Sequence, residues 1–401
     1  MKTMNAIINT SDFGSTGRIA TGLQNFLLAN GEKCILCYGQ GTQRNDNERY
    51  KFAGFCDMAF HKFNNLLTDS LCCASVTATN RLVERLRKLK VRNVYLINLH
   101  GLYLNERILF DYLVSDGIRV VYIMADESAF LGNCFYRNGC EKYKTECWGC
   151  HLQNSLQRII KPEASHKAYM IKRKAYTQMK CAFVAPEFVI LSAKESPLLA
   201  GCRTEIIDEA IDVNRNCPKD TTSLRKTLGI DENKIVIGCV APFRDPRKGV
   251  KYYLEAARQL EDDDRFVFVQ VGYDLPNKGE LPKNYIPIGF VNNQDELAVY
   301  YSLADLFVFP SLADTMPNAC LEALACGSPL LCFNVSGMPF IGDETVMTLV
   351  PEKDVEQMVE VILKTTKKNE MVISTCREYA LQRYDNQKYF QKLEMTMNSI
   401  N

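Results

Sequence analysis

The sequence of 401 residues has almost no net charge, because 48 basic side chains are balanced by 47 acidic ones and the total is +1. A nucleic-acid binder is therefore not expected, since affinity for phosphates needs a concentrated positive field. No window reaches the roughly 18 apolar, uncharged residues that a bilayer crossing needs. The segment from Met1 to Gly14 also lacks the apolar core of a secretory signal. These absences favour a soluble, cytoplasmic protein.

Disulfides are not needed for stability, although the sequence contains 17 cysteines. A chain of this length buries an adequate core without covalent links. Most of the cysteines, such as Cys239 and Cys332, lie within apolar runs. We expect these to be small buried side chains.

Four other cysteines form a separate pattern. Cys134, Cys140, Cys147 and Cys150 follow one another as Cys-x5-Cys-x6-Cys-x2-Cys in a polar, glycine-containing segment. The short final spacing is typical of tetrahedral zinc sites. We expect a structural zinc ion here, with no open position for catalysis; four unrelated thiols are the alternative.

Strand-like apolar runs alternate with amphipathic stretches along nearly the whole chain. Apolar residues recur at helical spacing in "TGRIATGLQNFLLAN" and "TNRLVERLRKL". This alternation predicts parallel sheets that are covered by helices on both faces. The expected strands are 4–9, 33–38, 94–99, 120–124, 182–186, 234–242, 265–272, 285–291, 306–310 and 328–333.

Length and pattern together predict two domains. The alternation is interrupted by a polar segment with a proline, "IDVNRNCPKDTTSLRKT", so we place the boundary near residue 213. The fold class is α/β, with two Rossmann-like doubly wound domains and an interdomain cleft at the carboxyl ends of the strands, where such sheets bind ligands. The expected parts are 1–213, 214–385 and a C-terminal helix in 386–401 that crosses back to the first domain.

The first loop at such an end is "NTSDFGSTGRIA". Gly14 and Gly17 allow a close backbone approach, and the helix that follows offers free N–H groups to an anion. An ordinary turn with Ser15 or Thr16 as the helix cap is the alternative. The spacing is not Gly-x-Gly-x-x-Gly, so a nicotinamide dinucleotide site is not supported.

The second loop, "APFRDPRKGV", contains Arg244, Arg247 and Lys248 before a helix that begins near Gly249. This group of cations suits a diphosphate. A solvated basic turn is the alternative.

The third loop lies in "SLADTMPNACLEALACGSP", which places Asp314 before a helix and Glu322 inside it. We expect Pro317 in the first turn of this helix and Gly327 at its end. Buried carboxylates are costly without partners, and the hydroxyls of a ribose or a hexose would be suitable ones.

These loops together resemble a known family. "PSLADTMPNACLEALACGSPLL" resembles the signature of glycosyltransferase family 4, retaining enzymes of the GT-B architecture, in which two Glu are separated by seven residues. "PFRDPRKG" resembles the diphosphate clamp of the family. "GSTGRIA" and "NLHGLYLN" resemble a branch that is common in bacterial surface-polysaccharide synthesis, and the likeness extends over essentially the full chain.

The resemblance implies a role for each of these residues. Glu322 would accept hydrogen bonds from the nucleotide ribose, Asp314 would contact the transferred sugar, and Arg244 with Lys248 would neutralise the diphosphate. No catalytic metal is expected. The remaining implied donor contacts are Gly14, Gly17, Arg247, Phe290, Val291, Thr315, Met316, Pro317 and Asn318.

Three departures from the family pattern affect these roles. Arg244 and Lys248 are four residues apart, slightly closer than is common in the family, so Arg247 is a further candidate for the diphosphate contact. Asp314 replaces the usual Glu, which shortens the side chain by one methylene. Ala125-Asp126 stands where the family usually has His-Asp, so the usual imidazole is missing. His100 is the remaining candidate at a strand end, and a purely structural histidine is its alternative.

The predicted function is transfer of a sugar, with retention, from a nucleotide-diphosphate donor to a saccharide or lipid-linked saccharide acceptor. A catalytically degenerate binding or scaffold subunit is the main alternative, and a sugar-nucleotide epimerase has less support. The basic run "RLVERLRKLKVRN" suits peripheral contact with the inner face of an anionic membrane, or else it is a solvated helix face.

Overall fold

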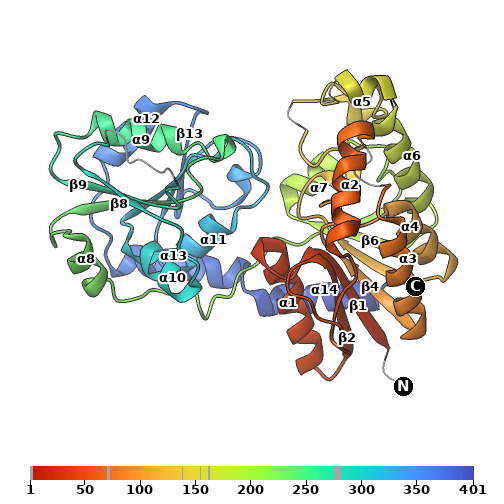
Figure 1. Cartoon of the computed structure of the whole chain (residues 1–401). Coiled ribbons are helices and arrows are strands. Elements are labelled where there is room, and N and C mark those ends of the chain that lie inside the picture. The colour runs from red at the N-terminus through yellow and green to blue at the C-terminus, as the bar shows by residue number, and fades with distance from the viewer. Residues whose placement is uncertain (1–2, 70–72, 138, 154, 161–162, 275–280) are drawn as a thin grey trace. The chain divides into compact units, whose positions relative to one another are not determined.

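The computed structural model describes residues 3–69, 73–137, 139–153, 155–160, 163–274 and 281–401 (Figure 1). The chain divides into two compact units. The N-terminal unit consists of Met1–Ile207 together with Phe390–Asn401, and the C-terminal unit is Asp208–Tyr389. The chain therefore returns to the N-terminal unit at its end.

The N-terminal unit contains a parallel sheet of seven strands in the order β3-β2-β1-β4-β5-β6-β7. Its central strands are largely apolar and mostly buried, as expected for a parallel sheet covered on both faces. The strands are β1 (Met4–Ser11), β2 (Lys33–Gln40), β3 (Arg49–Lys51), β4 (Val91–Leu96), β5 (Arg119–Ile123), β6 (Lys180–Ala185) and β7 (Arg203–Ile206).

Eight α-helices lie along or around this sheet among the residues that the structure describes. The last of them packs closely on the first: the ring centroids of Phe26 and Phe390 are 5.8 Å apart, and a Cβ atom on Gly22 would lie 2.6 Å from Phe390. Glycine at this position therefore permits the contact. The helices are α1 (Gly14–Ala29), α2 (Phe55–Thr68), α3 (Val76–Lys88), α4 (Glu106–Ser115), α5 (Ser155–Ile160), α6 (Ala164–Tyr176), α7 (Glu187–Lys194) and α14 (Asn386–Asn398).

The C-terminal unit contains a second parallel sheet, of six strands in the order β10-β9-β8-β11-β12-β13. Strands β8 and β11 are neighbours although they are far apart in the sequence, so the loops that follow them meet at one edge. The strands are β8 (Ile235–Val240), β9 (Phe266–Val271), β10 (Tyr285–Ile288), β11 (Leu306–Phe309), β12 (Leu330–Phe333) and β13 (Met347–Val350).

The helices of the C-terminal unit precede, connect and follow these strands. Buried apolar side chains from α9, α11 and α13 pack with the sheet in one hydrophobic core. The helices are α8 (Thr222–Leu228), α9 (Val250–Gln259), α10 (Gln294–Leu303), α11 (Asn318–Ala325), α12 (Val355–Leu363) and α13 (Glu370–Arg383), with short 3-10 turns η3 (Pro246–Lys248) and η4 (Met338–Phe340).

All ten predicted strands are present, and the prediction of two doubly wound parallel sheets is confirmed. Strands β3, β7 and β13, which are three of the four outermost strands, were not predicted from the sequence. None of the helices that the structure describes combines the length and the apolar character of a membrane crossing.

Candidate active site

An ion pair joins the two loops at the carboxyl edge of the C-terminal sheet. Lys248 follows β8 and Asp314 follows β11, and Lys248 Nζ lies 2.9 Å from both carboxylate oxygens of Asp314. Ser311 Oγ donates to Asp314 Oδ2 at 2.5 Å. Both charged side chains are only partly exposed, at 18% and 12%. The two predicted residues are therefore brought together and oriented by the fold.

The same two loops are also joined through their backbones. Leu312 N–H donates to Arg247 O at 2.7 Å, and Asp245 caps η3 by accepting from Arg247 N–H at 3.0 Å. Gly249 has a φ of +64°, and a Cβ atom there would lie 1.9 Å from Pro310 O. Only glycine fits this position, so the turn fixes where Lys248 points.

The two arginines of this loop have partners of their own. Arg247 Nη2 lies 2.8 Å from Asp245 Oδ2, and Arg244 Nε lies 3.7 Å from Asp274 Oδ2. The three predicted cations thus have separate carboxylate partners in this structure, and Lys248 is the one that contacts Asp314.

Glu322 lies in α11 and is buried, as the sequence predicts. Its Oε2 accepts a hydrogen bond of 2.8 Å from the hydroxyl of Tyr301 in α10. A buried carboxylate needs such a donor. Tyr301 was not identified from the sequence, because its contact depends on how α10 and α11 pack.

The turn before α11 brings an unsatisfied polar atom to the same edge. The helix begins at Asn318, so Pro317 is its cap residue rather than part of the first turn, and Met316 is buried. The Oδ1 atom of Asn318 is buried without a hydrogen-bond partner among the described residues. Buried polar atoms in folded proteins are normally paired, so this oxygen has the capacity to accept a further hydrogen bond.

Two further predicted residues follow β10, the outermost strand beside β9. Phe290 is exposed and Val291 is partly exposed in the segment between β10 and α10. They are available for contact with a flat ring, although nothing in the structure fixes that role. Gly327, at the other end of α11, has a φ of +82° and ends the helix as predicted.

In the N-terminal unit, the backbone conformation and close packing after β1 largely account for the two glycines predicted to approach a ligand. Gly14 begins α1 with a φ of +73°, and a Cβ atom on Gly17 would lie 2.7 Å from the carbonyl carbon of Asp12. The expected alternative of Ser15 or Thr16 as helix cap is wrong, because both lie inside α1 and Phe13 is the cap residue. Gly17 is needed for close packing whether or not a ligand approaches.

A histidine and a carboxylate pair at the carboxyl edge of the N-terminal sheet. His100 Nε2 lies 2.7 Å from Asp126 Oδ2, and the Phe135 ring stacks on the imidazole with centroids 4.7 Å apart. Burial by itself would raise the pKa of Asp126, but hydrogen bonds with His100 and Ser128 lower it below its usual value. The carboxylate therefore stays charged and orients the ring, beside Ala125 where the family usually has its histidine.

A buried lysine stabilises the loop that carries Asp126. Lys172 Nζ donates to three backbone carbonyls, of Ser128 at 2.6 Å, Leu131 at 3.0 Å and Gly132 at 3.1 Å. It also lies 3.9 Å from Glu106 Oε2, which is buried. Burial raises the pKa of Glu106, and the positive charge of Lys172 offsets this only in part. This pair could not be predicted from the sequence, because its members are far apart in the chain.

The four cysteines of the predicted zinc segment lie in the same region. Cys147 Sγ accepts a hydrogen bond of 3.1 Å from Gly132 N–H. Cys134 interacts electrostatically with the other three thiols, and burial raises its pKa to about 12 in the absence of metal. Among the described residues, no three metal-ligating side chains are placed closely enough to hold an ion. Zinc binding by this segment stays a prediction.

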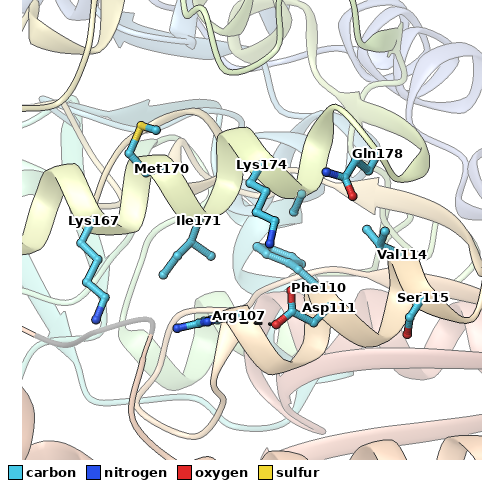
Figure 2. Close-up of a pocket in the computed structure, with 11 residues that line it drawn as sticks. Arg107, Phe110, Asp111, Val114, Ser115, Lys167, Met170, Ile171, Lys174 and Gln178 are labelled. Carbon is cyan, nitrogen blue, oxygen red and sulfur yellow. Dashed lines mark ion pairs between the residues drawn. The ribbon is translucent and has the colours of Figure 1, made fainter.

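A pocket of about 520 Å³ lies elsewhere in the N-terminal unit, between α4 and α6 (Figure 2). Lys167 and Lys174 point from α6 toward α4, where Arg107 pairs with Asp111 at 3.9 Å. None of the residues predicted for the donor or the acceptor lines this pocket.

Comparison with solved structures identifies the class of fold. The chain matches sucrose-phosphate synthase from Thermosynechococcus elongatus with a TM-score of 0.69 and 13% identity, covering 99% of this chain and 98% of the other. It matches Anabaena HepE, solved in complex with UDP and glucose, with a TM-score of 0.65 and 14% identity, covering 99% and 100%. The fold is GT-B, as predicted, and at these identities the likeness shows the fold alone.

Sequence comparison then identifies one segment more closely. Residues 234–368, in the C-terminal unit, match the family model "Glycosyl transferases group 1". One relative is TuaC of Bacillus subtilis (strain 168), which is named as a glycosyltransferase of teichuronic acid biosynthesis. It is 29% identical over 175 residues, which are 43% of each chain. An Escherichia coli UDP-Gal:alpha-D-GlcNAc-diphosphoundecaprenol alpha-1,3-galactosyltransferase is 25% identical over 179 residues, 41% of this chain and 45% of its own. The chain thus matches less than half the length of these relatives.

Proposed function

We propose that the protein is a glycosyltransferase of bacterial surface-polysaccharide synthesis. It would move a sugar from a nucleotide-diphosphate donor to a hydroxyl of a saccharide acceptor, with retention at the anomeric carbon. The observation that supports this best is the Lys248–Asp314 pair, which Ser311 and the Gly249 turn hold at the carboxyl edge of the sheet within the matched segment.

The residues around this pair suit the parts of such a donor. Lys248 would stabilise the charge that develops on the diphosphate as the glycosidic bond breaks, which is the kind of electrostatic help that often dominates catalysis. The carboxylate of Asp314 would accept hydrogen bonds from hydroxyls of the transferred sugar. The carboxylate of Glu322 would accept hydrogen bonds from the ribose hydroxyls. The buried Oδ1 of Asn318 would accept from a further ligand hydroxyl.

The relatives support the choice of donor and acceptor class. One is named for a UDP-sugar donor and a lipid-linked acceptor, and one structure contains UDP and glucose. Both curated relatives are named as glycosyltransferases, which favours an enzyme over a catalytically degenerate binding subunit.

His100 is the imidazole that we propose for the N-terminal unit in place of the missing family histidine. Asp126 fixes its Nε2 at 2.7 Å, so the other ring nitrogen, Nδ1, remains for an acceptor or sugar hydroxyl. This arrangement compensates for Ala125 with an imidazole from the neighbouring strand end.

A panel of nucleotide sugars tests the proposal. Donor turnover and release of the nucleoside diphosphate would be measured with and without oligosaccharide acceptors, and product anomers would be assigned by proton NMR. We expect turnover of at least one donor with retained configuration, and its loss in Lys248→Met. Lys251→Met is the matched control, because Lys251 is an exposed lysine of α9 that contacts no residue of the pair.

Two outcomes would contradict the proposal. Nucleotide binding without turnover of any donor would mean that the protein is a catalytically degenerate binding subunit. An inverted product would keep the enzyme but reject the retaining mechanism.

A further inference from the structure

Helices α4 and α6 pack against each other in the N-terminal unit and flank the pocket of about 520 Å³ that Figure 2 shows. Cavities of this volume are typical of sites that bind small organic molecules. The pocket is separate from the residues of the candidate active site, so its own lining has to indicate which ligand it would take.

The floor of the pocket is apolar and belongs to the hydrophobic core of the N-terminal unit. Phe110 in α4 is 1% exposed, and its ring packs edge-on against that of Tyr176, with the ring centroids 5.8 Å apart. Val114 and Ile171 are partly buried and pack against the same core. Because the core fixes these side chains, the floor offers a preformed apolar surface to a ligand.

Three cations surround this apolar floor. Lys167 and Lys174 point from α6 toward α4, which contributes Arg107 (Figure 2). Arg107 lies 3.9 Å from Asp111, the one carboxylate among the described lining residues. Neither lysine forms an ion pair within the part of the chain that the structure describes. The lining thus has an excess of positive charge, in a protein whose total charge is only +1.

The other end of the pocket is polar but uncharged. Ser115 ends α4 and Gln178 follows α6, and both lie on the far side of Lys174 from Arg107 (Figure 2). A hydroxyl and an amide can exchange hydrogen bonds with a neutral polar group. The lining therefore changes from cationic at one end, through an apolar centre, to neutral at the other end.

This combination selects against several classes of ligand. A divalent cation would meet an excess of positive charge and a single carboxylate that is already paired with Arg107. Inorganic phosphate would pair with the lysines but would leave the apolar floor in contact with water. An uncharged apolar molecule would cover the floor and leave the cations without a partner. A small organic anion satisfies both parts of the lining.

We propose that the pocket between α4 and α6 is a binding site for a small organic anion with an aromatic or branched aliphatic body. The carboxylate or phosphate of the ligand would lie between Lys167 and Lys174, and its body would cover Phe110 and Ile171. This binding does not rest on the proposed glycosyltransferase activity.

Such a ligand would bridge the two helices that hold the loop after Asp126. Glu106 in α4 and Lys172 in α6 are each adjacent in sequence to a lining residue, and their buried carboxylate and ammonium groups lie 3.9 Å apart. Lys172 also donates to the backbone of that loop, at Ser128 O. Hydrogen exchange of the backbone N–H groups in α4 and α6 should therefore slow when the pocket is occupied.

Titration of the chain with naphthoate, an aromatic carboxylate, and with naphthamide, its uncharged counterpart, tests the proposal. Ligand-observed NMR would measure both affinities, and hydrogen exchange would locate the bound ligand. For a ligand of this size we expect a Kd of about 1 mM or below for naphthoate. Naphthamide should bind about fivefold more weakly, because it lacks the charge that pairs with the lysines.

A pair of lysine variants tests the cationic end. Lys167→Met with Lys174→Met should weaken naphthoate binding by about fivefold and leave naphthamide binding unchanged. Lys180→Met with Lys194→Met is the matched control, because these two lysines are also exposed in the N-terminal unit but do not line the pocket.

A blocking variant tests the space itself. Gln178→Trp should weaken the binding of both ligands by about tenfold or more, because the indole would occupy the place of the ligand. Thr177→Trp is the control, since Thr177 is exposed next to Gln178 but does not line the pocket. Thermal unfolding of every variant should match the original protein, because all the replaced side chains are exposed.

Three results would overturn the proposal. The first is a Kd above about 10 mM for both ligands. The second is naphthoate binding that neither the lysine pair nor Gln178→Trp weakens, or that slows exchange only outside α4 and α6, because the anion would then bind elsewhere. The third is equal affinity for naphthoate and naphthamide, which would show that the cations do not recognise the ligand.

Discussion

In the C-terminal unit, the charged side chains at the carboxyl edge of the sheet are held by contacts between the two loops that carry them. In the N-terminal unit, the loop that follows Asp126 is held by a lysine from a separate helix. Lys248 and Asp314 are aligned by a glycine turn and a short 3-10 helix. His100 and Asp126 depend on Lys172, which lies two helices further along and binds the carbonyls of the loop after Asp126.

The two arrangements also differ in whether they lie inside the segment that matches the family model. The segment 234–368 contains both loops of the Lys248–Asp314 pair and ends before the chain returns to the N-terminal unit. In the N-terminal unit, the connection between β5 and β6 extends from Ile123 to Lys180 and contains the four cysteines. The family model thus matches the unit that contains the Lys248–Asp314 pair and not the unit that contains His100 and Asp126.

The largest effect is expected in the C-terminal unit. Asp314→Ala would leave Lys248 without its carboxylate and remove the proposed sugar contact, and we expect kcat/KM to fall by about 100- to 1000-fold. Initial rates over a range of donor concentrations would measure this, with Glu255→Ala on the exposed side of α9 as control. A loss below tenfold would mean that Asp314 only orients Lys248.

Metal removal should have the next largest effect, in the N-terminal unit. If the four cysteines bind zinc, elemental analysis would find about one zinc per chain, and Cys147→Ser would lose it with a fall in Tm of about 5 to 10 °C. Cys56→Ser, at an exposed cysteine of α2, should change neither. A metal-free protein in which all four thiols react as free cysteines would refute the zinc site.

A smaller effect is expected from the imidazole. His100→Ala should lower kcat/KM by about tenfold, which corresponds to one lost hydrogen bond to substrate. Asp126→Asn should have a similar effect if the carboxylate acts by orienting the ring, and the two changes combined should cost little more than either alone. Fully additive effects would show that the two residues act separately.

The smallest effect concerns Glu106. Its pKa is raised in the folded protein, so its contribution to stability is complete below the unfolded pKa of about 4.3 and is lost as the pH rises through the higher folded value. Glu106→Gln should therefore raise Tm by about 2 to 4 °C near pH 8 and by less near pH 4.5. Thermal unfolding at the two pH values would measure the difference, and an equal shift at both would exclude this cause.

The sequence predicted the central strands and missed the outer ones for a physical reason. A central parallel strand is buried on both sides and leaves a continuous apolar run. Strands such as Arg49–Lys51 and Arg203–Ile206 lie at an edge, are short and contain charged residues, so no run marks them. Edge strands are commonly short and charged, because this limits pairing with other chains.

In the candidate site, too, some features could be predicted from the sequence and others could not. Lys248, Asp314 and Glu322 could be found because each follows a recognisable strand or lies in a recognisable helix. The hydrogen bond from Tyr301 and the pairing of His100 with Asp126 could not, because they join segments whose proximity depends on the packing of the sheet.

The pairing of each cation after β8 with a carboxylate has a consequence for how a donor arrives. Arg244, Arg247 and Lys248 are already matched by Asp274, Asp245 and Asp314, so the edge presents little net charge to a distant anion. A diphosphate would be captured only at contact, by exchanging places with these carboxylates. The rate of donor association should then vary little with ionic strength, unlike that of enzymes whose open cationic sites attract their substrates from afar.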